Sequence, residues 1–168
     1  MPTRFGLGYD SHRFGADRPL KLGGTEIPHT SGLVGHSDGD AVAHAVTDAL
    51  LGAAALGDIG QLFPNDDPQW KDADSFVFLD AARVHVTGAG YTIVNVDATV
   101  VTEAPKLAPH VPKMREWLAT TLQVPLTAVS VKAKTAEKMD AVGKGEGLVV
   151  YAITSIDKGA VGWREGGE

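Results

Sequence analysis

The segment from residue 37 to residue 56 constrains the fold most, because it has the pattern of an amphipathic helix. Its apolar residues recur at steps of three and four and therefore share one helical face; they are Val42, Ala45, Val46, Ala49, Leu50 and Ala53. Asp40, His44 and Asp48 follow one another at steps of four and form a second, polar stripe. Ser37 or Asp38 is expected to cap the helix, with Asp40 in the first turn near the positive end of its dipole. The apolar stripe requires a surface to pack on.

Four segments with alternating apolar residues are predicted to be strands that supply this surface. They are residues 3–10, 91–101, 129–135 and 148–156. In the second segment, Val94, Val96, Ala98 and Val100 are expected to share the buried face. Residues 20–27 indicate a hairpin-like excursion that turns at the two glycines 23 and 24.

Two more helices and a loop complete the predicted elements. One helix is capped by Asp74 or Ser75 and runs to about residue 87, and another spans residues 110–122, with Trp117 on its apolar face. Residues 57–68 are rich in turn-forming residues and indicate a loop. We therefore expect an α+β fold: a mixed sheet of about four strands with helices packed on one face. The mixed character of the other face indicates an oligomer interface.

Composition narrows the class of protein. The 168 residues, 43% of them hydrophobic, fit one domain over residues 1–168 with a substantial core. The absence of a long apolar run or a signal-like start predicts a cytoplasmic protein with no membrane partner. The absence of cysteine excludes thiolate zinc sites and cysteine nucleophiles. With 15 basic and 21 acidic residues and no basic run, no nucleic-acid partner is expected.

The start of the chain, GYDSHRF, carries a candidate metal site. On a strand, Asp10 and His12 point to the same face while Ser11 points to the other. Together with His44 they supply one carboxylate and two imidazoles, and they leave a fourth position open, as in catalytic zinc sites. The alternative for His44 is a solvated side chain with no ligand role.

Other polar motifs are candidates for phosphate contacts. His36 and Ser37 precede the helix, where its dipole favours anions, although capping alone would also explain Ser37. APK presents Lys106, KTAEK follows a predicted strand, and GKGEG offers backbone amides to a phosphate or forms only a tight turn. The spacing of these glycines fits neither a P-loop nor a dinucleotide fingerprint.

Seven of these motifs, in order, resemble those of the 2-C-methyl-D-erythritol 2,4-cyclodiphosphate synthases over about residues 3–157. They are DSH, HSDGDAVAHAVTDALLGAAALGDIGQLFP, KDADS, NVDATVV, APK, KTAEK and GKGEG. The resemblance implies a homotrimer whose sheets face its centre and whose active sites lie between adjacent subunits. It also implies a phosphorus–oxygen lyase that converts 4-diphosphocytidyl-2-C-methyl-D-erythritol 2-phosphate to the cyclic diphosphate and CMP, in the non-mevalonate route to isoprenoid precursors.

The resemblance also implies roles for individual residues. Zinc would bind Asp10, His12 and His44, magnesium or manganese would bind Glu137 with the substrate phosphates, and His36, Thr135 and Glu137 would act in catalysis. The substrate phosphates and erythritol would contact Asp10, His12, His36, Ser37, Asp58, Ile59 and Gly60, under a loop of Phe63, Pro64, Asn65, Asp66 and Asp67. The neighbouring subunit would hold the cytidine diphosphate through Thr102, Ala104, Pro105, Lys106, Leu107, Ala133, Lys134, Thr135, Ala136 and Glu137. Lys144 is the last of the residues expected to contact the substrate.

Four residues depart from the pattern of this family. Asn65 replaces a usual aspartate, and Lys134 a usual threonine or serine, and both leave the chemistry plausible. Ala141 and Lys144 replace an aromatic residue and an arginine that can hold an isoprenoid diphosphate in the central cavity of the trimer. A lysine lacks the bidentate fork of arginine, and alanine lacks the apolar ring, so weak or absent binding of such a ligand is expected.

The proposed chemistry suits this residue set. A phosphate monoester is already anionic near pH 7, because its second pKa is about 6, so the attack needs no general base. Two divalent ions would offset the repulsion between the phosphates. The alternatives are a metal-dependent nucleotide-diphosphate phosphohydrolase, with water as nucleophile, and a trimeric module that only binds metal and nucleotide.

Overall fold

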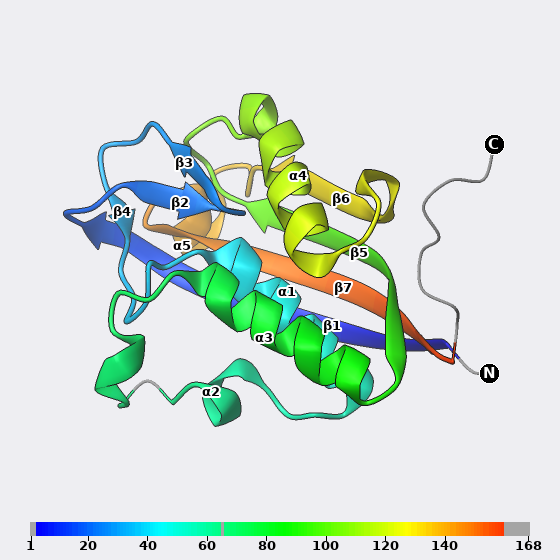
Figure 1. The fold of residues 1–168 in the computed structure, drawn as a ribbon. Coiled ribbons are helices and arrows are strands. Elements are labelled where there is room, and N and C mark those ends of the chain that lie inside the picture. The colour runs from blue at the N-terminus through cyan, green and yellow to red at the C-terminus, as the bar shows by residue number, and fades with distance from the viewer. Residues whose placement is uncertain (1–2, 65, 160–168) are drawn as a thin grey trace.

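The sheets are built from seven strands in the computed structural model, which describes residues 3–64 and 66–159 (Figure 1). The larger sheet has the strand order β4-β1-β7-β5-β6, and the smaller one pairs β2 with β3. Their bounds are β1 Thr3–Ala16, β2 Leu20–Leu22, β3 Thr25–Ile27, β4 Gly32–Leu33, β5 Tyr91–Val101, β6 Val129–Lys134 and β7 Gly147–Lys158. Only β5 and β6 are parallel, so the predicted mixed sheet is confirmed. It has five strands where four were expected, because the two residues of β4 are too few to show a pattern.

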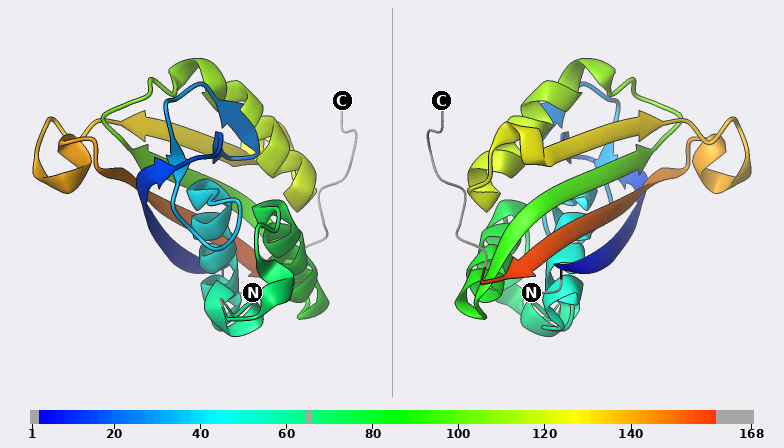
Figure 2. Two further views of the ribbon diagram at one scale, coloured as in Figure 1. Left: turned by 90° about the vertical axis from the view of Figure 1, so that its left-hand side faces the viewer. Right: turned by 90° about the vertical axis from the view of Figure 1, so that its right-hand side faces the viewer.

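The three long helices lie on one side of the larger sheet, as predicted (Figure 2). They are α1 (Ala41–Ala54), α3 (Ser75–Gly88) and α4 (Val111–Leu122). The segment predicted as a plain loop, residues 57–68, instead contains the short helix α2 (Ile59–Leu62) and leads into the 3-10 helix Pro68–Trp70. Further short helices are α5 (Asp140–Gly143) and the 3-10 turns Ala108–His110 and Leu126–Ala128. Within residues 3–64 and 66–159, no helix combines the length and the apolarity needed to cross a membrane.

Asp40 caps α1, where the sequence predicted Ser37 or Asp38. Its carboxylate accepts hydrogen bonds from the backbone N–H groups of Val42 and Ala43, both at 3.1 Å. It also accepts those of Gly23 and Gly24, at 2.8 and 2.7 Å, in the turn between β2 and β3. Four donors satisfy a carboxylate that is fully buried. Asp40 therefore fastens α1 to the hairpin and does not belong to a polar stripe on the helix.

Two strands differ from their predicted form. β1 continues to Ala16, well past residue 10, so His12 lies inside a regular strand. In β5 the pairing with β7 shifts between Ile93 and Asn95, which is the mark of a β-bulge. Ile93 and Val96 are both buried as a result, and Val94, predicted to be on the buried face, is only half-buried.

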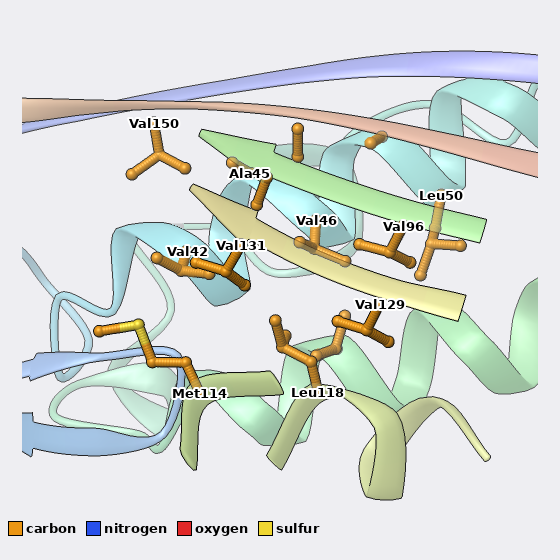
Figure 3. Packing of buried hydrophobic residues seen from close by; sticks show 14 of the residues in the cluster. Val42, Ala45, Val46, Leu50, Val96, Met114, Leu118, Val129, Val131 and Val150 are labelled. Atoms are coloured by element: carbon orange, nitrogen blue, oxygen red, sulfur yellow. The ribbon is translucent and has the colours of Figure 1, made fainter. Parts of the chain in front are cut away.

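The core lies between the helices and the sheet (Figure 3). The apolar stripe of α1 packs there with residues of β5, β6, β7 and α4; those labelled in Figure 3 are Val42, Ala45, Val46, Leu50, Val96, Met114, Leu118, Val129, Val131 and Val150. Trp117 was predicted on the apolar face of α4 but is 46% exposed. Its ring meets the Phe76 ring edge-on, with the centroids 6.1 Å apart.

Two glycines of β1 allow α1 to lie directly on the strand. A Cβ added at Gly6 would lie 1.9 Å from the carbonyl oxygen of Ala49, and one added at Gly8 would lie 1.8 Å from that of Ala45. Such distances are shorter than any real contact, so only glycine fits at these two positions.

The opposite face of β1 and β7 is apolar and exposed. Phe5, Leu7 and Tyr9 on β1, and Tyr151 and Ile153 on β7, are 46 to 70% exposed. The rings of Tyr9 and Tyr151 lie next to each other, with their centroids 5.3 Å apart. Because the side chains of a strand alternate, this face is the one turned away from the helices.

Candidate active site

Asp10, His12 and His44 meet at the N-terminal half of α1. Asp10 Oδ2 lies 2.8 Å from His12 Nε2 and 3.0 Å from His44 Nδ1, and one ligand atom from each residue lies within 4.8 Å of the others. Strand alternation places the first two on the helix side of β1, and the close approach at Gly8 brings His44 to them. The structure thus brings together the three residues that the sequence singled out as metal ligands.

The far nitrogen of each imidazole has its own hydrogen-bond partner. His12 Nδ1 lies 2.7 Å from the carbonyl oxygen of Val34, and His44 Nε2 lies 2.7 Å from Ser75 Oγ and 3.1 Å from Ser37 Oγ. Metal-bound histidines almost always donate their other ring N–H in this way. The donor set of two ring nitrogens and one carboxylate oxygen therefore fits a divalent ion such as zinc, with a position left open.

The electrostatics of this group depend on Asp10. Burial disfavours its ionised form, but hydrogen bonds and charge interactions with His12 and His44 outweigh burial and hold the Asp10 pKa well below its ordinary value. Burial likewise disfavours protonated His12, yet the hydrogen bond and the charge of Asp10 raise the His12 pKa above its ordinary value. The carboxylate is thus ionised across the physiological range and available to a cation.

A cavity of about 240 Å³ opens beside the three residues. Eight of the predicted substrate or metal residues line it: Asp10, His12, His36, Ser37, His44, Ile59, Gly60 and Phe63. Asp58 caps α2 by accepting a hydrogen bond from the Gln61 backbone N–H at 2.9 Å, and Pro64 and Asp66 are exposed on the loop after α2. Asp67 caps the 3-10 helix that follows. Asn65 lies outside the described residues.

Aromatic residues form one wall of the cavity, and of these the sequence singled out Phe63 but not Trp70 and Phe78. Phe63, Trp70 and Phe78 pack against each other with ring centroids 4.7 to 5.6 Å apart, and Phe78 also faces the ring of His44. Tyr9 and Gly35 complete the lining. In the sequence Trp70 and Phe78 resemble ordinary core or loop residues, so no local signal marks these two positions.

Asp48 also lines the cavity, and its carboxylate accepts a hydrogen bond from the backbone N–H of Ile59 at 2.8 Å. Burial raises the pKa of Asp48, and the charges of Asp58 and Asp10 add to this effect. Asp48 therefore ties α2, and with it the edge of the cavity, to α1. Its place in the polar stripe with His44 was the signal that could have identified it.

Arg18 holds the segment that carries His36 and Ser37. Its guanidinium donates to the carbonyl oxygens of Leu33 at 2.9 Å, Ser37 at 2.5 Å and Gly35 at 3.3 Å. The planar group thus braces residues 33–37 along one side of the cavity. No sequence pattern indicates this role, because the contacts join distant parts of the chain.

The segments expected to hold cytidine diphosphate lie side by side, at the carboxyl ends of parallel strands β5 and β6. The Thr102 N–H donates to the Lys134 carbonyl at 2.9 Å, and the Ala136 N–H donates to the Glu103 carboxylate at 3.2 Å. The Thr135 hydroxyl donates to the carboxylate of Glu137. The side chain of Lys106 is exposed and Leu107 is buried. Within the described part of the chain, no residue of 102–107 or 133–137 lines the cavity beside Asp10.

The two residues that depart from the family pattern around the predicted central cavity both lie at α5. Ala141 is in this helix, and Lys144 is its C-cap; both are exposed. Ala141 lines a separate cavity of about 340 Å³, together with Ser11, Arg13 and Glu146.

Comparison with known proteins shows extensive similarity. The model of the YgbB family matches residues 3–157. The 2-C-methyl-D-erythritol 2,4-cyclodiphosphate synthase of Stutzerimonas stutzeri is 54% identical over 153 residues, which cover 91% of this chain and 98% of the relative. The enzyme of that name from Edwardsiella ictaluri is 52% identical over 155 residues, or 92% of this chain and 99% of the relative.

Solved structures share the fold. The bifunctional IspDF of Campylobacter jejuni superposes with a TM-score of 0.91 and 41% identity over 94% of this chain, which spans 42% of that longer protein. IspF of Plasmodium falciparum, in complex with CDP, superposes with a TM-score of 0.81 and 33% identity, over 93% of this chain and 96% of that one. With a family match over nearly its whole length and relatives more than 50% identical, this chain belongs to the YgbB family.

Proposed function

We propose that the chain is a 2-C-methyl-D-erythritol 2,4-cyclodiphosphate synthase: it converts 4-diphosphocytidyl-2-C-methyl-D-erythritol 2-phosphate to the cyclic diphosphate and CMP, in the non-mevalonate pathway. The observation that carries the proposal is the group of Asp10, His12 and His44 beside a cavity, in a chain 52 to 54% identical to relatives of that name. The proposal treats residues 1–168 as a single catalytic domain in the cytoplasm.

The reaction is an intramolecular phosphoryl transfer. An oxygen of the 2-phosphate attacks the phosphorus of the diphosphate that bears the erythritol, and the bond from that phosphorus to the oxygen of CMP breaks. CMP leaves with the electron pair of that bond, and no water is consumed, which makes the enzyme a phosphorus–oxygen lyase. Because the attacking phosphate is already anionic at neutral pH, the site needs charge compensation and alignment more than a general base.

The residues of the chain divide this work. Asp10, His12 and His44 would hold zinc, and Glu137 would hold magnesium or manganese with the diphosphate. When bound, these ions supply positive charge that offsets the repulsion between the two phosphate groups. His36 and Ser37, which line the cavity in the segment braced by Arg18, would orient the 2-phosphate. Thr135, whose hydroxyl donates to Glu137, would contact the diphosphate.

The aromatic wall supports cyclisation over hydrolysis. Phe63, Trp70 and Phe78 present apolar rings to the cavity, and such a lining leaves few places for an ordered water that could replace the 2-phosphate as nucleophile. Asp58, Ile59 and Gly60 would bind the erythritol hydroxyls, and the hydrogen bond from Ile59 to Asp48 ties this segment to α1.

The proposal includes a homotrimer with shared sites. Two observations support it: the exposed apolar face of β1 and β7 requires a cover, and residues 102–107 and 133–137 lie away from the cavity beside Asp10. In a cyclic trimer each cavity would receive these segments from the adjacent subunit.

Product analysis tests the activity. The purified chain, loaded with zinc, is incubated with the cytidyl substrate and Mg²⁺, and the products are followed by phosphorus NMR. We expect the two coupled resonances of a cyclic diphosphate together with CMP, and no product in a sample treated with a chelator. Two open-chain phosphates would instead identify a phosphohydrolase, and binding without turnover would identify a binding module.

Mixing inactive variants tests the shared site. His44→Ala removes a cavity residue and Lys106→Ala removes a nucleotide-side residue, so mixed trimers contain interfaces at which both residues are intact. Some activity should return once subunits have exchanged. Equally inactive samples, with exchange demonstrated by mass spectrometry of tagged subunits, would place the whole site within one chain.

A further inference from the structure

The two histidines of the candidate metal site are fixed by different kinds of partner. Nδ1 of His12 faces the carbonyl oxygen of Val34 at 2.7 Å, and a carbonyl can only accept. The ring proton of neutral His12 is therefore held on Nδ1, which leaves the lone pair of Nε2 free for a metal. The backbone alone thus orients this imidazole.

Nε2 of His44 faces hydroxyl groups, which can either donate or accept. Ser75 Oγ lies 2.7 Å away and Ser37 Oγ lies 3.1 Å away. If the nearer hydroxyl donated to Nε2, the ring proton of a neutral His44 would move to Nδ1, and the nitrogen closest to Asp10 could not bind a metal. Something beyond these hydroxyls must decide the direction of the hydrogen bond.

Asp38 decides it. Ser75 Oγ donates to Asp38 Oδ1, and an ionised carboxylate can only accept. The carboxylate is kept ionised by Lys21 Nζ at 2.9 Å, and it also accepts the backbone N–H groups of Asp40 at 3.1 Å and of Ser75 at 3.2 Å. With its proton directed to Asp38, the Ser75 hydroxyl presents a lone pair to His44.

We propose that Ser75 and Asp38 are positioning residues that keep the ring proton of His44 on Nε2 and so turn Nδ1 into the metal ligand. This inference rests on the proposed metal site but not on the reaction that occurs there. Neither residue lines the cavity beside Asp10, so their effect on a metal passes through His44.

The pair Ser75 and Asp38, called the relay below, is held in a fixed position relative to the His44 ring. Ser75 is fully buried at the first turn of α3, and Asp38 lies in the segment before α1, with its ion-pair partner Lys21 on β2. Three separate elements thus converge on one ring nitrogen. Ser37 Oγ is farther from that nitrogen and also accepts the Gly39 N–H at 3.3 Å, so it plays the lesser part.

Zinc affinity tests the relay without any use of turnover. Metal-free full-length chain is titrated with Zn²⁺ in competition with a chromophoric chelator. Loss of such a hydrogen-bond partner typically weakens metal binding about 10- to 100-fold, and we expect this loss for Ser75→Ala. Ser75→Thr, which keeps the hydroxyl, should restore most of the affinity. The matched control is Thr47→Val, which removes another buried hydroxyl of this region that bonds only to the Ala43 carbonyl of its own helix, and it should bind zinc like the parent.

Asp38→Asn tests the direction of the bond. The positive charge of Lys21 would attract the amide oxygen of the asparagine and turn its NH₂ group to Ser75, so the hydroxyl would then donate to His44. Zinc affinity should fall at least as far as in Ser75→Ala, although the variant is almost isosteric. Affinities within twofold of the parent for both Ser75→Ala and Asp38→Asn would overturn the proposal.

Nitrogen NMR of the zinc-loaded parent gives a test that requires no variant to fold. The ring of His44 should carry its proton on Nε2, visible as a slowly exchanging signal with a nuclear Overhauser contact to the Ser75 methylene. A proton on Nδ1, with zinc on Nε2, would overturn the relay even if the chain binds zinc and turns over its substrate. Absence of zinc binding would instead contradict the proposed metal site.

Discussion

Gly8 of β1 lies against the backbone of Ala45 in α1, so closely that a Cβ on Gly8 would stand 1.8 Å from the Ala45 carbonyl oxygen. Asp10 follows Gly8 on the same side of the strand, and His44 directly precedes Ala45 on the helix. The 3.0 Å separation of Asp10 Oδ2 and His44 Nδ1 therefore depends on how closely strand and helix pack.

Gly8→Ala is expected to separate the two elements. Relief of the clash requires α1 to move, so the free energy of unfolding should fall by about 3 kcal/mol or more, at the upper end of the usual cost of overpacking. Zinc bound per chain should fall as well. The control is Gly52→Ala on α1, where an added Cβ meets nothing within 4 Å. It should raise the free energy of unfolding by about 0.5–1 kcal/mol. Urea denaturation and metal analysis measure both effects, and a Gly8→Ala chain as stable as the parent would contradict this account.

His44→Ala should remove the metal while leaving the fold in place, because His44 is not part of the buried apolar stripe of α1. We expect less than one tenth of the zinc of the parent and a fall in kcat/KM of at least about a hundredfold, more than the loss of a ligand's outer partner costs. His85→Ala, at the exposed end of α3, is the control and should retain both. Full zinc occupancy in His44→Ala, measured by atomic absorption, would refute the ligand assignment.

The metal-free chain should lose stability as the pH rises above neutrality. Because the folded chain raises the His12 pKa above 6.5, protonated His12 stabilises the fold at pH values below 6.5, and this contribution is lost as the pH passes the raised pKa. The lowered Asp10 pKa acts in the opposite sense: its contribution is present above pH 3.8 and is lost only in strong acid. The metal-free chain is therefore expected to be most stable in mildly acidic solution.

Thermal unfolding of chelator-treated protein between pH 5 and pH 9, about the range in which histidine titrates, measures this trend. In His12→Gln the melting temperature should fall less steeply as the pH rises above neutrality. Zinc affinity should show the reverse dependence and increase with pH, since the metal competes with the proton for His12. A metal-free chain that gains stability from pH 6 upward would contradict the assigned direction.

The regular elements were the parts of the fold that the sequence predicted well. α1, α3 and α4 each show a three-to-four residue period, and the long strands alternate, because each buries one face against the same core. Sequence periodicity could not reveal the bulge at Ile93 or the two-residue strand β4, since neither repeats a pattern. The Asp40 cap was missed because half of its partners are the amides of Gly23 and Gly24, which lie 17 and 16 positions away.

The residues of the candidate site also fall into those that the sequence could identify and those that it could not. Asp10, His12 and His44 could be found because strand and helix periods place chemically matched side chains on facing surfaces. Arg18 lies in no motif, and Ser75, in KDADS, was expected only as a possible helix cap; their contacts with the site could not be found because each acts on residues that are distant in the chain. Trp70 and Phe78 were missed for another reason: a cavity wall and a core use the same aromatic residues.

A charge placed on the exposed apolar face should prevent trimer formation. Ile153→Glu, on β7, would bury an unpaired carboxylate in the proposed interface and should give a single chain of 17.6 kDa in sedimentation velocity. Val84→Glu is a matched control, because Val84 is 51% exposed on α3 and Ile153 is 48% exposed. The control should remain trimeric. An unchanged trimer in Ile153→Glu would place the interface on another surface.

Farnesyl diphosphate should bind weakly. Alanine at position 141 lacks the aromatic ring common in the family, and with it apolar contact worth roughly 1–2 kcal/mol. Lysine at position 144 offers the diphosphate a point charge instead of the bidentate fork of arginine. Calorimetric titration at physiological salt should give no submicromolar affinity for the parent. The double substitution Ala141→Phe and Lys144→Arg should strengthen binding at least tenfold, which corresponds to about 1.4 kcal/mol. Submicromolar affinity of the parent would contradict the prediction.

The pairing of β1 with β7 joins the two ends of the chain, from Thr3 with Asp157 to Arg13 with Gly147. The strand that carries Asp10 and His12 is synthesised long before β7, so over residues 3–13 it has no strand neighbour in the larger sheet until β7 has left the ribosome. Contacts so distant in sequence form late and slowly. A ribosome-bound chain that ends before Gly147 would therefore leave this edge of β1 unpaired, and the strand that carries Asp10 and His12 would gain its long partner only after β7 has been made.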